Sequence, residues 1–328
     1  MKRRALILSS GAYAALAVAG ARAQTAAAPR RIAWLWMSAP ENNKQNDEIF
    51  AARMRELGYV EGRDYMVERR YAEGKVERVG VLARELLALK PDLVVASTSP
   101  VAAAFKRETT AVPVVFVSVV DPDRQGFVAS LAHPGGNMTG VGFPGLELQA
   151  KVLEMTRELL PAARRVTMLG IEGDTTLVRF RPETQRRFEA KGFALEFVAV
   201  SAAPQDLEAA IARVSSHKAD VLYVPPHAFF VWQAGRLGEL ALRARLPMVG
   251  PRRAFAAAGG LFSYDNDNKQ DFRRAASFVA RIFKGTKPAE LPVEYPDRFQ
   301  LIVNLRTAKA LGITIPQSVL LRADEVIE

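Results

Sequence analysis

The first half of this chain is echoed in its second half, roughly 130 residues later. Three short segments carry the echo: Leu57-Gly58-Tyr59 returns as Lys191-Gly192-Phe193, Lys90-Pro91-Asp92 as Lys218-Ala219-Asp220, and Val112-Pro113-Val114 as Leu246-Pro247-Met248. Each copy falls at the same place in an alternation of strands and helices. A repeat of this length predicts two similar α/β lobes, and two lobes imply a cleft between them.

Short apolar strands alternate with amphipathic helices through both halves. The pattern predicts strands at 31–36, 64–71, 93–96, 114–117, 165–169, 194–200, 220–224, 248–249 and 300–303. It predicts helices at 44–57, 76–89, from Pro100 onward, and at 147–159, 175–190, 204–215, 228–245, 268–283 and 304–311. Continuous apolar strands separated by helices indicate parallel sheets covered on both faces. The predicted fold class is therefore α/β, with two Rossmann-like lobes built on parallel sheets.

Glycine-rich segments mark where the chain is expected to cross between the lobes. The first crossing is predicted at 135–145, and the return at 259–264. Lobe one would then comprise 30–143 with about 264–290, and lobe two 144–263 with about 291–328. Several crossing strands would form the hinge.

The first 23 residues predict a secretory signal peptide. Lys2, Arg3 and Arg4 precede an apolar run at 5–20, and Ala21-Arg22-Ala23 fits a cleavage site. An N-terminal anchor helix is the alternative, but the apolar run is short for a membrane span. The arginine pair leaves the Sec and twin-arginine routes open. We expect a periplasmic protein without a lipid anchor, because anchoring at the cleavage point requires a cysteine.

The absence of cysteine and the placement of charge exclude several functions. Without Cys there is no disulfide, thiolate metal site or cysteine nucleophile. The net charge is +10, and the four basic residues of the signal segment account for part of it, leaving +6. Acids and bases alternate along most helices, which indicates a mixed, solvated surface. Basic and aromatic residues do not interleave in the pattern that binds nucleic acid, so no nucleic-acid partner is expected. His133, His217 and His227 lack metal-ligand spacing, and no phosphate-binding glycine motif occurs. We expect neither metal nor cofactor.

In an open parallel sheet, ligands bind beyond the carboxyl ends of the strands. This rule selects Trp36, Ser38, Ser97, Thr98, Ser99, Ser118 and Asp121 in the first half, and Ile171, Glu172, Pro226, His227 and Arg252 in the second. Tyr264, at the expected return crossing, would lie at the rim of the cleft. Trp36 and Tyr264 could stack on a flat ligand, although Trp36 equally suits core packing.

Two of these positions suit the charged ends of an amino acid. Ser97-Thr98-Ser99 precedes a helix, where N–H groups and hydroxyls favour a carboxylate; a plain N-cap is the alternative. Asp121 suits a ligand ammonium group, or else forms an ordinary turn before proline. A Ser–His–Asp triad could be drawn from Ser97, His227 and Asp121, but no G-x-S-x-G elbow supports it.

Several motifs resemble one known family. They are ELGYVEGR at 56–63, LKPDLVVA at 89–96, VPVVFV at 112–117, Asp121-Pro122, LAHPGGNMTG at 131–140, KGTKPAELPVE at 284–294 and NLRTAKALG at 304–312. Together they resemble the substrate-binding proteins of ABC transporters in the tryptophan/tyrosine-binding (TrpX-like) group. The resemblance implies a type I periplasmic-binding-protein fold, ligand capture by lobe closure, and delivery to a permease in the inner membrane. Some relatives bind aromatic amino acids.

The resemblance also bears on the candidate site. Ser97-Thr98-Ser99 and Asp121 match positions where that group binds the carboxylate and ammonium of an amino acid. Relatives usually carry Asp or Asn near Pro226-His227 and a small polar residue near Ile171-Glu172, so the second lobe's pocket wall departs from the family pattern.

The sequence therefore predicts a monomeric, non-enzymatic solute-binding component of an ABC importer, with an aromatic or other amino acid as its ligand. A sensor that feeds a membrane receptor is an alternative, because it would use the same cleft. A secreted hydrolase is another. The effector domain of a transcription regulator is disfavoured by the signal peptide and by the lack of a helix-turn-helix.

Overall fold

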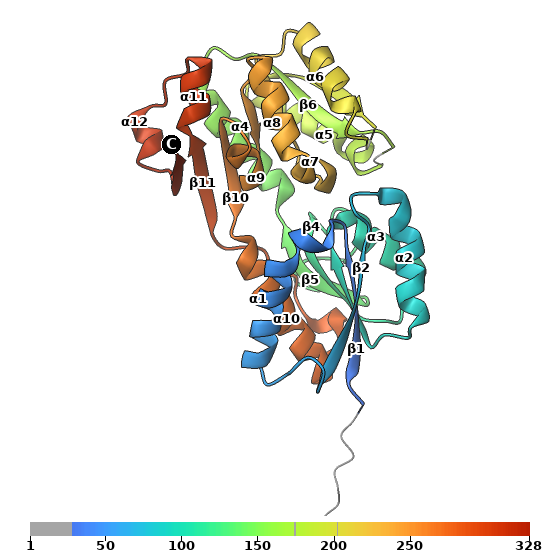
Figure 1. The fold of residues 1–328 in the computed structure, drawn as a ribbon. Helices are drawn as coiled ribbons and strands as arrows, with labels where there is room; N and C mark the ends of the chain where they lie inside the picture. Colours follow the sequence, from blue (N-terminus) through green and yellow to red (C-terminus); the bar gives the residue numbers. More distant parts are fainter. Residues whose placement is uncertain (1–27, 174, 202) are drawn as a thin grey trace, which may run out of the picture.

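The computed structural model describes residues 28–173, 175–201 and 203–328, so the predicted signal peptide lies outside the described residues. Two sheets with helices on both faces form an upper and a lower body (Figure 1). The first sheet is wholly parallel and has the order β2-β1-β3-β4-β5. Its strands are β1 (Arg30–Trp36), β2 (Tyr65–Tyr71), β3 (Leu93–Ser97), β4 (Val114–Val120) and β5 (Met138–Phe143).

The second sheet repeats that order and then extends it. Strands β7-β6-β8-β9-β10 are parallel and correspond to β2-β1-β3-β4-β5, while β11 runs antiparallel to β10 and parallel to β12. The strands are β6 (Arg165–Ile171), β7 (Ala194–Val200), β8 (Val221–Tyr223), β9 (Met248–Gly250), β10 (Phe262–Asn266), β11 (Phe299–Asn304) and β12 (Glu325–Ile327). Both halves thus have the same topology, and the predicted fold class is confirmed.

The sequence echo corresponds to the same local structure in each sheet. The carboxylate of Asp92 accepts the backbone N–H of Arg31 at 2.7 Å, and that of Asp220 accepts the N–H of Arg165 at 2.8 Å. The lysine two positions before each aspartate has a φ of 52°. Each aspartate therefore ties the start of one strand to the first strand of its own sheet.

Helices cover both faces of the first sheet. Its cover consists of α1 (Lys44–Glu56) and α10 (Asn268–Phe283) on one face, and α2 (Val76–Ala88) and α3 (Ser99–Glu108) on the other. In Figure 1, α10 lies beside α1 although it comes from the far end of the chain. Arg273 of α10 forms an ion pair with Glu56 of α1 at 2.7 Å. The first lobe is therefore completed by a late segment.

The second sheet is covered in the same manner. One face carries α4 (Gly145–Leu159), α5 (Thr175–Ala190), α11 (Leu305–Leu311) and α12 (Gln317–Leu320); the other carries α6 (Asp206–Ser216), α7 (Ala228–Trp232), α8 (Ala234–Arg243) and α9 (Arg253–Ala257). Two short 3₁₀ turns are η1 (Pro40–Asn42) and η2 (Pro288–Glu290). Among the described residues, no helix combines the length and apolarity needed to cross a membrane.

Two expected elements differ from the structure. The single helix predicted at 228–245 is divided at Gln233 into α7 and α8. The segment predicted as the return crossing contains the start of β10, which pairs with β9 and β11 inside the second sheet. The return therefore follows Asn266, because the apolar residues Leu261 and Phe262 are buried in the second core rather than in the hinge.

The described chain passes between the sheets at three places. Pro144 separates β5 from α4, Asp267 separates β10 from α10, and 296–298 precede β11. Just before the third passage, Glu294 still bridges Val141 of β5. We propose lobe limits at these passages, with 30–143 and 268–295 in lobe one and the remainder in lobe two.

The packing of α8 against the turn after α9 predicts an asymmetric effect of two glycine substitutions. A Cβ at Gly238 would lie 1.6 Å from the carbonyl oxygen of Ala258, whereas a Cβ at Gly235 meets nothing within 4 Å. We expect Gly238→Ala to lower the free energy of unfolding by about 1–3 kcal/mol through overpacking. Gly235→Ala, in the same helix, should raise it by about 0.4–1 kcal/mol. Urea denaturation of both variants measures this, and equal midpoints would contradict the observed packing.

Candidate ligand-binding cleft

A cleft of about 980 Å³ opens between the carboxyl ends of the strands of the two sheets. Twelve of the thirteen residues selected from the sequence line it: Trp36, Ser38, Ser97, Thr98, Ser99, Ser118, Asp121, Ile171, Glu172, Pro226, His227 and Arg252. They come from segments that are far apart in the chain and from both lobes. The strand-end rule therefore brings these residues to one cavity, and their roles toward a ligand remain predictions.

Tyr264 does not line the cleft. It occupies the middle of β10, where it pairs with Leu301 of β11, and its ring stacks on Phe299 with centroids 6.0 Å apart. The side chain packs against the core of the second lobe. The expected position at the rim is corrected, because the return crossing begins only after β10.

Trp36 reaches the cleft but is a core residue, with 3% of its surface exposed. Its ring stacks on Trp34 at 4.7 Å and lies 5.4 Å from the ring of Phe272. Since core aromatics pack against its ring, Trp36 has the packing role that was the alternative to stacking on a ligand.

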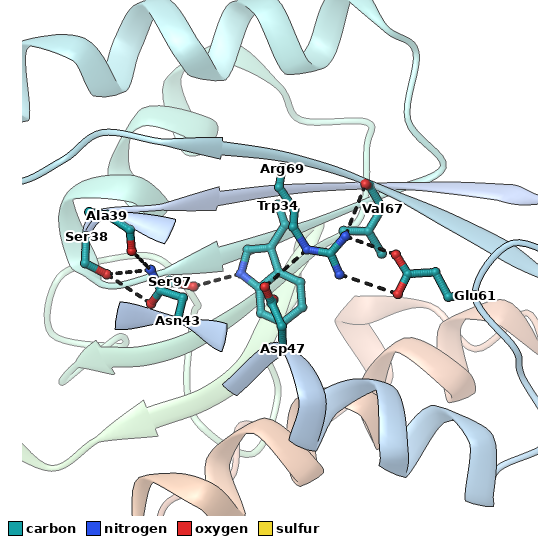
Figure 2. Close-up of polar contacts among 9 residues, drawn as sticks. All are labelled: Trp34, Ser38, Ala39, Asn43, Asp47, Glu61, Val67, Arg69 and Ser97. Carbon is teal, nitrogen blue, oxygen red and sulfur yellow. Dashed lines mark hydrogen bonds and ion pairs between the residues drawn. The ribbon is translucent and has the colours of Figure 1, made fainter. Parts of the chain in front are cut away.

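The loop after β1 is held by one buried amide, as Figure 2 shows. The Nδ2 group of Asn43 donates to the hydroxyl of Ser38 at 2.8 Å and to the carbonyl of Ala39 at 2.7 Å. This arrangement fixes Ser38 at the cleft and presents Asn43 beside it.

The hydroxyls of Ser97-Thr98-Ser99 do not act as a simple helix cap. The Oγ of Ser97 accepts the indole N–H of Trp34 at 2.9 Å (Figure 2), and the Oγ of Ser99 accepts the N–H of Val120 at 3.0 Å. Thr98 is the N-cap residue of α3 but makes no side-chain capping bond. Each serine hydroxyl still carries a hydrogen that it can donate to a ligand.

Backbone strain is concentrated at this edge of the first sheet. Thr98, Ser118 and Asp121 have φ values of 84°, 57° and 38°. Residues other than glycine rarely adopt this left-handed region. The register of β4 against β5 shifts at Ser118, which marks a bulge. Such conformations cost about 1–3 kcal/mol each and cluster at functional sites.

Asp121 is a buried carboxylate with 9% of its surface exposed. Its Oδ2 accepts the N–H of Leu146 at 3.2 Å, in the first turn of α4, so it bridges the first passage between lobes. Burial raises the pKa of Asp121 to about 6, and the amides of Leu146 and Gly145 together with Arg124 only partly offset this. Its backbone carbonyl also accepts from Gln125, as a turn residue would. The group therefore combines a turn role with a charge that a ligand cation would stabilise.

The alternative of a catalytic triad is not supported by the hydrogen bonds. In a triad the histidine Nδ1 donates to the aspartate. Here Nδ1 of His227 accepts the N–H of Phe229 at 3.2 Å, as the cap of α7. Asp121 instead accepts from α4, and the Ser97 oxygen accepts from an indole. The three side chains are committed to other structural bonds.

Several residues at the cleft were missed by the sequence analysis or given no role. They are Asn268 at the start of α10, Gln149 of α4, Trp232 of α7, and the Arg252 and Asp265 pair after β9 and in β10. Only Arg252 carried a signal, since it lies two residues after the end of β9. The others lie within or beside helices and in a strand first taken for a crossing, where the strand-end rule does not reach.

The two lobes touch at the mouth of the cleft. The ring of Trp232 covers Gly74, where a Cβ would lie 2.8 Å from the indole. Gly74 also has a φ of 77°, so both space and backbone favour glycine there. Arg124 of the first lobe pairs with Glu183 of α5. These contacts join the lobes independently of any ligand.

Two parallel-sheet lobes around a strand-end cleft define a two-lobed ligand-binding protein with the periplasmic-binding-protein fold. The family model of the ABC transporter substrate binding protein matches residues 38–327. The chain therefore belongs to this family, which is one of solute-binding proteins rather than enzymes.

Individual relatives agree with this assignment. The chain is 26% identical over 267 residues to the tyrosine-binding protein of Clostridioides difficile, covering 80% of this chain and 75% of that protein. A Streptococcus pneumoniae ABC domain solved in complex with L-Trp superposes with a TM-score of 0.83 at 24% identity, over 91% of this chain and all of that one. A solute-binding protein from Rhodopseudomonas palustris, in complex with 3,4-dihydroxybenzoic acid, gives 0.57 at 15% identity over 81% and 82%. These structures share the fold of this chain.

The strain at Thr98 predicts an unusual response to glycine. We expect Thr98→Gly to be more stable than Thr98→Ala by about 1 kcal/mol, because glycine adopts a φ of 84° without the penalty that a Cβ brings. Urea denaturation of the two variants measures the difference.

Thr109, at the other end of α3, supplies the matched control because its φ is −149°. There the order should reverse, with Thr109→Gly less stable than Thr109→Ala by about 1 kcal/mol. The same order at both positions would show that Thr98 is not strained.

Proposed function

We propose that this protein is the solute-binding component of an ABC importer and captures a small aromatic ligand, foremost an aromatic amino acid. It would act as a monomer in the periplasm after removal of the signal peptide, and deliver its ligand to a permease in the inner membrane. The observation that carries the proposal is that buried Asp121 and the Ser97-Thr98-Ser99 segment line the same cleft.

The polar end of the ligand would lie against the first lobe. Asp121 has no lysine or arginine within ion-pair distance among the described residues, so a ligand ammonium would offset the cost of its burial. The hydroxyls at Ser97, Thr98 and Ser99 would donate to the carboxylate beside the N-terminus of α3. Phe180 and Ile171, which line the opposite wall, offer apolar surface to a side chain.

The placement of these groups on both walls supports ligand capture by lobe closure. The cleft is lined from both sheets, while three chain passages connect the lobes. A ligand that contacts both walls makes more contacts in the closed state, and this differential affinity shifts the equilibrium toward closure. The relatives that bind tyrosine and L-Trp favour an aromatic amino acid over other small carboxylates.

Thermal unfolding with a ligand panel tests the proposal. The panel contains the aromatic amino acids, branched-chain amino acids, aryl carboxylates and nucleosides. A ligand at about 100 times its dissociation constant should stabilise the protein by about 2.7 kcal/mol. We expect this stabilisation for an aromatic amino acid. If only nucleosides raise the unfolding temperature, or if no amino acid raises it, the amino-acid assignment is contradicted. The family assignment would be unchanged.

Asp121 predicts how amino-acid binding depends on pH. Its carboxylate must be ionised to pair with an ammonium group, and its pKa is about 6 in the ligand-free protein. The dissociation constant should therefore be flat above pH 7 and rise about tenfold for each pH unit below 6. Calorimetric titration at several pH values measures this. Asp121→Asn should weaken binding and remove the dependence, whereas Asp123→Asn, in the same turn, should retain it.

The stability of the ligand-free protein should change in the opposite direction. The folded-state pKa of Asp121 exceeds its ordinary value of 3.8, so the folded state holds the proton more tightly than the unfolded state. This contribution to stability is lost as pH rises from about 4 through 6. Weaker binding at low pH would therefore not result from loss of the fold at this site.

A further inference from the structure

Arg252 is a largely buried cation in the wall of the cleft. It follows β9 in the second lobe, lines the cavity, and has 14% of its side chain exposed. Its guanidinium carbon lies 4.0 Å from the centroid of the Phe143 ring, at the end of β5. The aromatic face fixes the guanidinium plane beside the first passage between lobes.

The hydrogen bond between Arg252 and its acidic partner is long and therefore weak. Among the described residues, Asp265 is the one carboxylate within ion-pair distance, and the contact from Nη1 to Oδ1 is 3.5 Å long. Asp265 already accepts the backbone N–H of Arg253 at 2.8 Å and that of Asn266 at 2.9 Å. Burial raises the pKa of Asp265 even with Arg252 beside it.

A guanidinium has five N–H donors, and the described protein groups supply one long hydrogen bond. None of the remaining donors is among the buried polar atoms without a partner, so these donors keep contact with solvent and are available to an acceptor that replaces it. The cleft is the side from which an acceptor can arrive, because Arg252 lines it. A carboxylate matches the fork of a guanidinium with two parallel hydrogen bonds, which a neutral amide cannot do.

We propose that Arg252 is the second lobe's contact for the carboxylate of the ligand, and that it makes the cleft select carboxylates over their neutral amides. The inference rests on the proposed function in that it needs a small ligand in this cleft. The carboxylate is then held from both sides, by the hydroxyls after β3 in lobe one and by Arg252 in lobe two. Such a bridge exists only when both walls approach, so it couples the ligand's charge to closure.

Both an α-amino acid and an aryl carboxylic acid carry the carboxylate that Arg252 would bind. An amino acid places an ammonium group at Asp121 as well as a carboxylate at Arg252, so its two charges match the two buried groups. An aryl acid would use Arg252 and leave Asp121 without a cation. Comparing L-Trp with indole-3-propionate, which lacks the ammonium group, separates the two sources.

The test is the ratio of affinities for a carboxylate and its amide, measured by calorimetry on the full chain at pH 7.5. L-Trp is compared with L-tryptophanamide, and 3,4-dihydroxybenzoate with its amide. We expect the native protein to prefer the carboxylate by about 10- to 100-fold. R252Q should reduce this preference to about threefold or less, and R252K should fall between them.

Arg253 provides the matched control. It is the adjacent residue, but its guanidinium pairs with Glu325 at the surface and it does not line the cleft. R253Q should retain the full preference. Thermal unfolding of each variant establishes that it folds, and R252K substitutes for R252Q if the latter does not.

Each result decides the inference. If R252Q weakens acid and amide by equal factors, Arg252 only supports the wall and the proposal is wrong. If aryl acids bind with an Arg252-dependent preference but amino acids do not, the carboxylate contact stands and the amino-acid assignment fails. If no carboxylate ligand binds the native protein, both are overturned.

Discussion

The parallel direction of the strands determines where this protein can bind a ligand. Five strands in each sheet run the same way, so crossovers must connect them, and helices cover both faces of each sheet. Backbone groups and polar side chains remain accessible mainly at the ends of the strands. The two sheets present these ends to one cleft, which is lined by residues from β1, β3, β4, β6, β8 and β10.

Buried aspartates lie at two of the passages between the lobes. Asp121 accepts from Leu146 across the first passage, and Asp271 accepts the Nδ2 group of Asn266 at 2.8 Å across the second. Burial raises the pKa of Asp121 to about 6 and that of Asp271 to about 7. The ionised forms are the costly ones, so a nearby cation would stabilise these buried carboxylates. Asp121 lies both at the first passage and in the cleft.

The strand-end rule succeeded and failed for identifiable reasons. It selected Ser118 and His227, which line the cleft, because strand direction decides which edge of the sheet a residue reaches; their contacts to a ligand stay a prediction. It misplaced Tyr264 because the segment around it forms a strand, and a strand's extent depends on its partners β9 and β11. It could not exclude ligand stacking on Trp36, since only the packed structure shows Trp34 and Phe272 against that ring.

The sequence by itself determined the repeated topology, the fold class and a set of strand-end residues that line the cleft. Those properties depend on local periodicity and on spacing along the chain, which are read without knowledge of long-range contacts. Only the tertiary structure decided the state of each site group: the burial of Asp121, the left-handed backbone at Thr98, and the weakly paired guanidinium of Arg252. These depend on distances between segments far apart in sequence, because burial and Coulomb interactions are properties of neighbours in space.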